Sequence, residues 1–266
     1  MKIFKSFHAL WGFLCCALII QAAFVYAITN GLIPNNYYPM GRFYILLSLA
    51  VLYTVLSQGV GGIWNLIRPM LVWRVSPWWY LFAVFWLAFF AITILFFKNI
   101  LNGDAFASIL LTFTMFENAS IIWGIVLTSI IEEIVWIGLV LTILQQRFTP
   151  LVASQILGVF WYLWWVPVIL YGQAVVPGLP VSILWFHYLG IAATCAWVYY
   201  FTKSGLLVAL MQILTNSVSL IVPILPHLSD TLTYVTFIIG KFLFVLVLFA
   251  VFGPKPLFGR KVRAAY

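Results

Sequence analysis

The sequence predicts an all-α membrane protein, a polytopic helix bundle with about eight transmembrane helices and both termini in the cytoplasm. Hydrophobic residues fill 65% of the 266 positions and charged residues only 7%, which leaves too few charges for the surface of a soluble domain. The mean hydropathy is +1.15. The apolar residues also fall into runs of about 20, the length that a helix needs to cross the hydrocarbon core.

The apolar runs place the helices in order along the chain. We expect them at residues 7–28, 43–65, 78–97, 119–146, 151–171, 181–202, 205–223 and 232–252. The breaks between them carry turn formers, as in "GLIPNNYYPMGR", "KNILNGD" and "GQAVVPGLP". The stretch 105–116 is too short for a further span and is expected at the membrane interface. The first run follows basic residues as a signal peptide does, but an uncleaved helix is the better interpretation because the rest of the chain also spans.

The basic residues predict the orientation of these helices. With a cytoplasmic start, the inner side receives Lys2, Lys5, Arg68, Arg74, Arg147, Lys203, Lys255, Arg260, Lys261 and Arg263. The outer side receives only Arg42 and Lys98, and Lys241 is left within a helix. Such an excess of positive charge marks cytoplasmic loops. Because the net charge of +8 is spread over segment ends, it indicates membrane orientation and not a nucleic-acid-binding patch.

Glu132 and Glu133 are the most unusual residues of the predicted fourth helix. They are two of only five acidic residues in the chain, and a charge at the centre of a bilayer costs at least ~2.5–3.5 kcal/mol on insertion scales. Adjacent residues of a helix point about 100° apart. One glutamate could therefore face a polar cavity while the other holds a neighbouring helix.

Other polar residues in the apolar runs each have two interpretations. Lys241 either pairs with one of the glutamates or extends its long stem to an interface. His187 and His227 are expected to be ordinary polar or loop residues and not ligands. Gln212 and Asn216 are four residues apart and share a helix face, where they serve either hydrogen bonding between helices or a site.

Three sequence blocks suggest a known family. The first is Glu132-Glu133-Ile134-Val135-Trp136-Ile137-Gly138, the second places Trp161, Trp165 and Pro167 in "FWYLWWVP", and the third runs from Gln212 to Asn216 after "YYFTKSGLL". Their order and spacing resemble the CAAX-protease and bacteriocin-processing family (CPBP, also called Abi) of integral membrane proteins. Bacterial members typically carry Glu-Glu-x-x-Trp-Arg-Gly, Trp-x-x-x-His-x-Pro and His-x-x-x-Asn blocks. The resemblance covers roughly residues 60–220.

The resemblance implies one membrane domain in three parts. Residues 1–59 would supply N-terminal transmembrane helices, 60–223 the CPBP-like core with the three blocks, and 224–266 the last transmembrane helix and a basic tail. It also implies roles for the retained residues. Glu132 would activate the water that attacks a peptide carbonyl, Glu133 would support it, and Asn216 would donate to the oxyanion.

The chain departs from the family pattern at three positions. The arginine is replaced by Ile137, the first histidine by Trp165 and the second by Gln212. An indole cannot accept a proton, and an amide cannot relay one at neutral pH. We therefore expect peptide-bond hydrolysis to be impaired, and the protein to act by binding a membrane or peptide partner.

Two other functions stay open from the sequence. One is an active glutamate-dependent intramembrane protease, with Glu132 as general base and a substitute such as His187. The other is a small-solute carrier with the glutamates as proton or cation sites, although no internal repeat supports it. We expect no cofactor, no metal and no nucleic-acid partner, because the sequence has no HExxH motif, no phosphate loop and no metal-ligand spacing at its cysteines. The expected location is the cell membrane.

Overall fold

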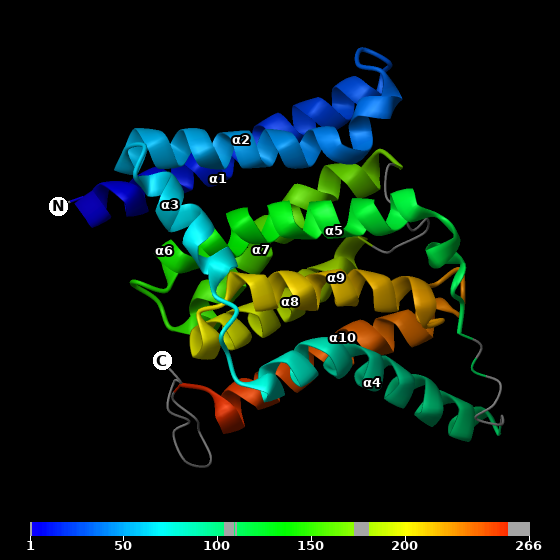
Figure 1. Ribbon diagram of the computed structural model, residues 1–266. Helices are drawn as coiled ribbons and strands as arrows, with labels where there is room; N and C mark the ends of the chain where they lie inside the picture. The colour runs from blue at the N-terminus through cyan, green and yellow to red at the C-terminus, as the bar shows by residue number, and fades with distance from the viewer. Residues whose placement is uncertain (1, 104–108, 110, 173–180, 255–266) are drawn as a thin grey trace.

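The computed structural model describes residues 2–103, 109, 111–172 and 181–254, and this part of the chain is a bundle of helices without a strand (Figure 1). The predicted polytopic helical fold is confirmed. The long helices are α1 (Lys2–Thr29), α2 (Tyr38–Gln58), α4 (Pro77–Asn102), α5 (Ala119–Glu133), α7 (Pro150–Leu170), α8 (Val181–Thr202), α9 (Gly205–Ile221) and α10 (Thr231–Phe252). Short helical segments complete it: η1 (Asn35–Tyr37), α3 (Gly62–Ile67), η2 (Arg68–Leu71), η4 (Thr114–Glu117), η5 (Ile134–Leu141) and α6 (Thr142–Leu144).

Seven helical stretches in the described residues are long and apolar enough to cross a membrane. One of them is the continuous run of α5, η5 and α6, which spans Ala119–Leu144. The remaining predicted span is α9, an apolar helix of 17 residues. At about 1.5 Å per residue, this helix falls a few ångströms short of a hydrocarbon core about 30 Å thick.

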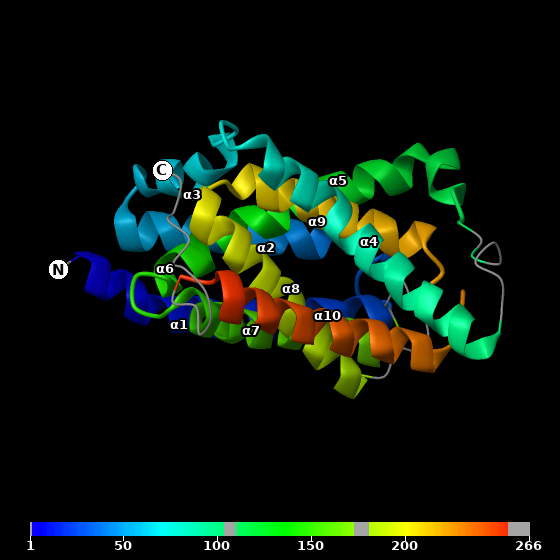
Figure 2. The ribbon, with the colours of Figure 1, turned by 90° about the horizontal axis from the view of Figure 1, so that it is seen from below.

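The long helices alternate in direction, so that the first turns of α1 and the last turns of α10 lie at the same end of the bundle (Figures 1 and 2). The turns before α7 and before α9 lie at that end as well, and they carry Arg147 and Lys203. Lys98 belongs to the last turns of α4 at the opposite end. This arrangement agrees with an even number of crossings. A cytoplasmic location of both termini stays a prediction.

The second helix differs from its predicted range of 43–65. It begins earlier, at Tyr38, and it ends at Gln58 because Gly59 follows with φ of +81°, a backbone conformation that other residues rarely adopt. The chain then forms the separate α3 and η2, which run across the bundle rather than along it (Figure 1). The earlier start has a second consequence, because it places Arg42 inside a helix and not in an outer loop.

Side-chain caps fix several other helix boundaries. Asn118 accepts a hydrogen bond from the backbone N–H of Ser120 at the start of α5, and Thr149 caps α7, whose first residue is a proline. Ser204 and Asp230 cap α9 and α10 in the same way. These residues satisfy N–H groups that have no partner within the helix. Of the short predicted segment 105–116, residues 105–108 and 110 lie outside the described residues, and its last three residues belong to η4.

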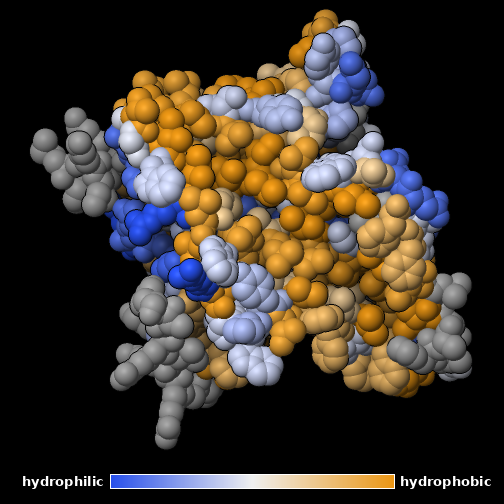
Figure 3. All heavy atoms as spheres, viewed as in Figure 1, coloured by the Kyte–Doolittle hydropathy of each residue, from blue (hydrophilic) through white to orange (hydrophobic). Residues whose placement is uncertain are grey.

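Among the seven candidate spans, α8 and the run from α5 to α6 are the most buried and α4 is the least buried. Glycines allow α7, α8 and α10 to approach closely. A Cβ on Gly158 of α7 would lie 2.9 Å from the Cα of Leu189, and one on Gly190 of α8 would lie 3.4 Å from the Cα of Phe242. Small residues at such crossings are typical of membrane helix packing. The face shown in Figure 3 is largely apolar, with hydrophilic residues gathered towards the two ends of the bundle.

Candidate functional site

Glu132 and Glu133 close the α-helical part of α5, immediately before the π-helix η5. Both side chains are buried, at 3% and 0% exposure. At the end of η5 the backbone N–H of Thr142 bonds to the carbonyl of Ile137, five residues earlier. The wider π turns rotate the residues that follow relative to a regular α-helix, and π segments within α-helices occur frequently at functional sites.

Tryptophans from two helices surround the Glu132 carboxylate. The indole Nε1–H of Trp161 on α7 donates to Glu132 Oε1 at 3.2 Å. Trp136 and Trp165 lie close enough for their indoles to interact with the same carboxylate, although neither N–H reaches hydrogen-bonding geometry. The rings of Trp136 and Trp161 are 5.9 Å apart. We call Glu132 and these three indoles the Glu132 cluster.

A cation from α2 completes the surroundings of Glu132. Arg42 is only 4% exposed, and its guanidinium carbon lies 3.9 Å from the ring centroid of Trp165 and 4.5 Å from that of Trp164. These are cation–π distances. Arg42 attracts Glu132 electrostatically but is not within the 4.0 Å of a salt bridge. The positive charge that the motif loses at Ile137 is thus partly supplied by another helix.

Glu133 has a different environment from its neighbour. Both of its carboxylate oxygens are buried and have no hydrogen-bond partner among the described residues. Its electrostatic neighbours include Glu132 and Cys195 of α8. Of the two adjacent carboxylates, Glu132 is therefore the one that receives donors.

The third sequence block packs against α5 next to the glutamates. The Asn216 amide donates from α9 to the hydroxyl of Ser129 at 3.2 Å, one turn before Glu133. Gln212 lies one turn earlier on α9, is 4% exposed, and has an Oε1 atom without a partner among the described residues. Trp165, the third substituted position, stacks on Tyr188 of α8 with an interplanar angle of 23°. The contacts described here connect Asn216 to Ser129 and not to Glu132.

Lys241 neither pairs with a glutamate nor extends to an interface, the two arrangements that the sequence suggested. It is fully buried, so its stem does not reach an interface, and its Nζ lies 3.1 Å from Nδ1 of His187 instead of pairing with a glutamate. The geometry explains this: Lys241 on α10 packs against α8, where Gly190 leaves room for the lysine stem. His187 is thereby engaged with Lys241 and not with Glu132.

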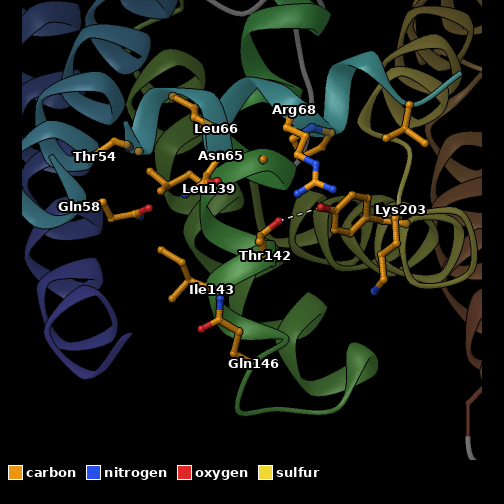
Figure 4. Close-up of a pocket in the computed structure, with 15 residues that line it drawn as sticks. Thr54, Gln58, Asn65, Leu66, Arg68, Leu139, Thr142, Ile143, Gln146 and Lys203 are labelled. Carbon is orange, nitrogen blue, oxygen red and sulfur yellow. Dashed lines mark hydrogen bonds between the residues drawn. The ribbon is translucent and has the colours of Figure 1, made fainter. Parts of the chain in front are cut away.

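A cavity lies beyond the glutamates, at the end of the bundle that carries Arg147 and Lys203. Its volume is about 390 Å³, and its walls come from α2, α3, η2, η5 and the end of α8. Figure 4 shows Arg68 and Lys203 beside the hydrogen bond between Thr142 Oγ1 and the Tyr199 hydroxyl, which measures 2.9 Å. Neither Glu132 nor Glu133 lines this cavity. We call it the basic cavity.

Sequence reasoning missed Arg42, Trp136 and Tyr188 as neighbours of the carboxylate. Trp136 had a visible signal, because it belongs to the first block itself. Arg42 is far from the blocks in sequence, and the one signal for it was an arginine directly before the apolar run "FYILL". Tyr188 carried no signal beyond its apolar surroundings.

The helix bundle and its buried carboxylates define a polytopic membrane protein with an intramembrane polar cluster. Comparison with known families refines this description. Residues 114–218 match the family model of type II CAAX prenyl endopeptidase Rce1-like proteins. The matched residues contain all three sequence blocks. No curated protein matches the chain.

Proposed function

We propose that this protein is a catalytically impaired member of the CPBP family that binds a peptide or protein partner within the cell membrane. The observation that carries the proposal is the Glu132 cluster. The expected general base is surrounded by indoles, and the position of the family's first histidine holds Trp165, whose ring lies on Arg42 and Tyr188. The retained residues then have structural roles: Glu132 joins α5 to α7 through Trp161, and Asn216 joins α9 to α5 through Ser129.

The chemistry of the substituted residues supports this proposal. A general base that activates water needs a neighbour that can take up and return a proton. Trp165 offers one N–H donor and no acceptor, and the Gln212 amide does not titrate near neutral pH. His187, the histidine proposed from the sequence as a substitute, is engaged with Lys241. The residues that remain can hold Glu132 in place, but they provide no proton relay to it.

The family description suggests the class of partner. The substrates of CAAX prenyl endopeptidases are prenylated peptides, and a member that has lost hydrolysis can still retain affinity for them. We propose that such a peptide, or a membrane helix of similar apolar character, is the ligand. The alternative is an active protease with Glu132 as general base. The experiment must distinguish this alternative from binding without hydrolysis.

The test uses an internally quenched, farnesylated CAAX peptide and the full chain in lipid nanodiscs. We expect no cleavage above that of empty nanodiscs, and saturable binding of the peptide measured by fluorescence anisotropy. Glu132→Gln keeps the size and hydrogen-bonding capacity of the side chain but removes its basicity. This variant should bind the peptide within about twofold of the unchanged protein.

If the unchanged protein cleaves the peptide and Glu132→Gln abolishes this cleavage, the proposal of impaired hydrolysis is wrong. Absence of both cleavage and saturable binding would remove prenylated peptides as the partner class. A third variant, Trp165→His with Gln212→His, restores both histidines of the family pattern. Cleavage gained by this variant would support their absence as the cause of the impairment.

A further inference from the structure

The basic cavity contains two cations and no carboxylate in its lining. Arg68 enters it from η2 and Lys203 from the turn after α8. The polar side chains between them are amides and hydroxyls, among them Asn65 and Gln58. Figure 4 shows that these groups lie around one space. Such a lining of cations and neutral hydrogen-bonding groups is complementary to an anion with several oxygen atoms.

The two cations are not neutralised by the described part of the protein. Arg68 has no salt bridge or hydrogen bond to any described residue, and the lysine ammonium lies 5.5 Å and 5.0 Å from the ring centroids of Tyr199 and Tyr200. Neither Glu132 nor Glu133 belongs to the cavity wall. Both cations line the same cavity, where an anion would find positive charge that no described carboxylate balances.

Lys203 also occupies an unusual backbone position. Its φ of +53° makes it the one described residue other than glycine with a positive φ. The residue that follows a helix in this left-handed conformation is usually glycine, because a Cβ there is strained. Compared with glycine, a lysine at this position strains the backbone but places a charged side chain at the cavity. Such strain often accompanies a functional role.

The position of the cavity in the bundle points to a lipid. Its wall includes α3 and η2, which run across the ends of the long helices and so lie parallel to a membrane surface (Figure 1). Trp64, Ile67, Leu71 and Trp73 are exposed along this segment. Exposed tryptophans are typical of the level of lipid headgroups. The cavity is thus at the depth where the phosphate of a lipid would be.

We propose that the basic cavity binds the phosphate-bearing headgroup of an anionic phospholipid. Arg68 and Lys203 contact the phosphate oxygens, and the acyl chains pass along the apolar surface beside α3. A volume of about 390 Å³ is within the range of small-ligand sites. The site is separate from the Glu132 cluster, and the proposal does not depend on the proposed function.

The experiment measures lipid retained by the full chain, using native mass spectrometry after exchange between phosphatidylglycerol and phosphatidylcholine of identical acyl chains. We expect preferential retention of phosphatidylglycerol. Arg68→Gln with Lys203→Gln should lower this preference about tenfold or more, since each cation near a membrane surface contributes about a fivefold effect. Arg74→Gln is the matched control, because it removes an arginine two residues beyond the cavity wall and should leave the preference unchanged.

The variant Lys203→Gly distinguishes a lipid-binding role of Lys203 from a structural role. Glycine relieves the positive φ, so we expect a higher melting temperature together with weaker retention of phosphatidylglycerol. Equal retention by the unchanged chain, Lys203→Gly and the double variant would overturn the proposal. The proposal would also be overturned if inorganic phosphate stabilises the protein in phosphatidylcholine nanodiscs while the protein shows no preference for phosphatidylglycerol. The cavity would then bind the free anion and not a lipid.

Discussion

At the scale of single residues, the Glu132 carboxylate depends on groups from two other helices, α7 and α2. The Trp161 indole donates to it, Arg42 attracts it, and the Arg42 guanidinium stacks on the ring of Trp165. A buried charge that loses its partner becomes a large cost, whereas removing both charges together costs far less. The pair can therefore be tested by a double-mutant cycle.

Arg42→Met is expected to destabilise the protein by about 3 kcal/mol, because Glu132 is left as an uncompensated buried group. Glu132→Gln should cost less on its own. The double variant should be more stable than the sum of the two effects predicts, which is the sign of coupling between the residues. Unfolding in mixed detergent micelles measures all three. Arg74→Met, at an exposed position, serves as control and should change stability by about 0.5 kcal/mol or less.

Asp230 gives a pH-dependent contribution at the opposite end of the bundle. Its carboxylate lies 2.5 Å from the Lys98 ammonium and caps α10 through the N–H and hydroxyl of Thr233. The hydrogen bond from Lys98, followed by those from Thr233, holds the pKa of Asp230 below its usual range. A depressed folded-state pKa means that the stabilisation is complete above about pH 4, the unfolded value, and is lost as the pH falls through the folded value.

Asp230→Ala should therefore cost about 1 kcal/mol at pH 7, as loss of a helix cap does, and less below pH 4. Asp230→Asn retains a capping oxygen but not the charge, so it should keep most of the neutral-pH stability and lose the pH dependence. Thermal unfolding between pH 3 and pH 7 measures both. An identical pH profile in all three proteins would contradict the assignment.

The sequence located the retained and substituted motif positions, because they form local blocks whose spacing is visible. It could not locate Arg42, since the contact between α2 and α7 depends on how the helices pack. It also misplaced the partner of Lys241. An apolar run identifies a lysine as buried, but it does not say whether α10 packs against α5 or α8. The roles of Glu132, Glu133, Asn216, Trp165 and Gln212 stay predictions.

At the scale of elements, the π-helix η5 connects the glutamates to the basic cavity. Its residue Gly138 faces α3 so closely that a Cβ would lie 2.6 Å from the backbone carbonyl oxygen of Leu66. Backbone atoms cannot yield as a flexible side chain can. The glycine of the first sequence block is therefore explained by the approach of α3, not by chemistry at the carboxylates.

Gly138→Ala is expected to destabilise the protein by about 1–3 kcal/mol, the typical cost of overpacking. Gly124→Ala is the matched control on the same continuous helical run, because a Cβ there meets nothing within 4 Å. Alanine favours a helix over glycine, so the control should be neutral or slightly stabilising. Chemical unfolding of both variants in one detergent makes the comparison. Equal stability of the two would refute the steric explanation.

Most elements could be predicted from the sequence, and the exceptions have physical causes. Runs of apolar residues bounded by proline, glycine and capping residues predicted the long helices within a few residues. The π turns of η5 could not be predicted, because their residues are as apolar as those of an α-helix. The break after Gln58 was visible as "QGVGG" but was read as part of a span, since the apolar residues on either side appear continuous.

At the scale of the whole molecule, each loop that connects two long helices lies at one of the two ends of the bundle. Gln146, in the turn before α7, lies at the end with the basic cavity, and Leu32, after α1, lies at the other. Both side chains are exposed. The end with the greater number of basic residues is expected to be cytoplasmic.

This orientation predicts opposite labelling of two introduced cysteines. In a chain with Cys15, Cys16 and Cys195 replaced by alanine, Leu32→Cys should react with a membrane-impermeant maleimide from outside the cell. Gln146→Cys should react only after the membrane is opened. The reverse pattern would mean that the bundle is inserted the other way round, and labelling of both from outside would mean an even number of crossings between them.

The Glu132 cluster also gives the protein a built-in optical reporter. Trp136, Trp161, Trp164 and Trp165 form a chain of ring contacts with centroids 5.7–6.1 Å apart, and indoles fixed in such an arrangement produce near-ultraviolet circular dichroism that disappears when packing is lost. The difference spectrum between the unchanged protein and Trp161→Phe isolates the signal of this cluster from the other tryptophans. Occupancy or loosening of the intramembrane polar centre can then be followed without an added label.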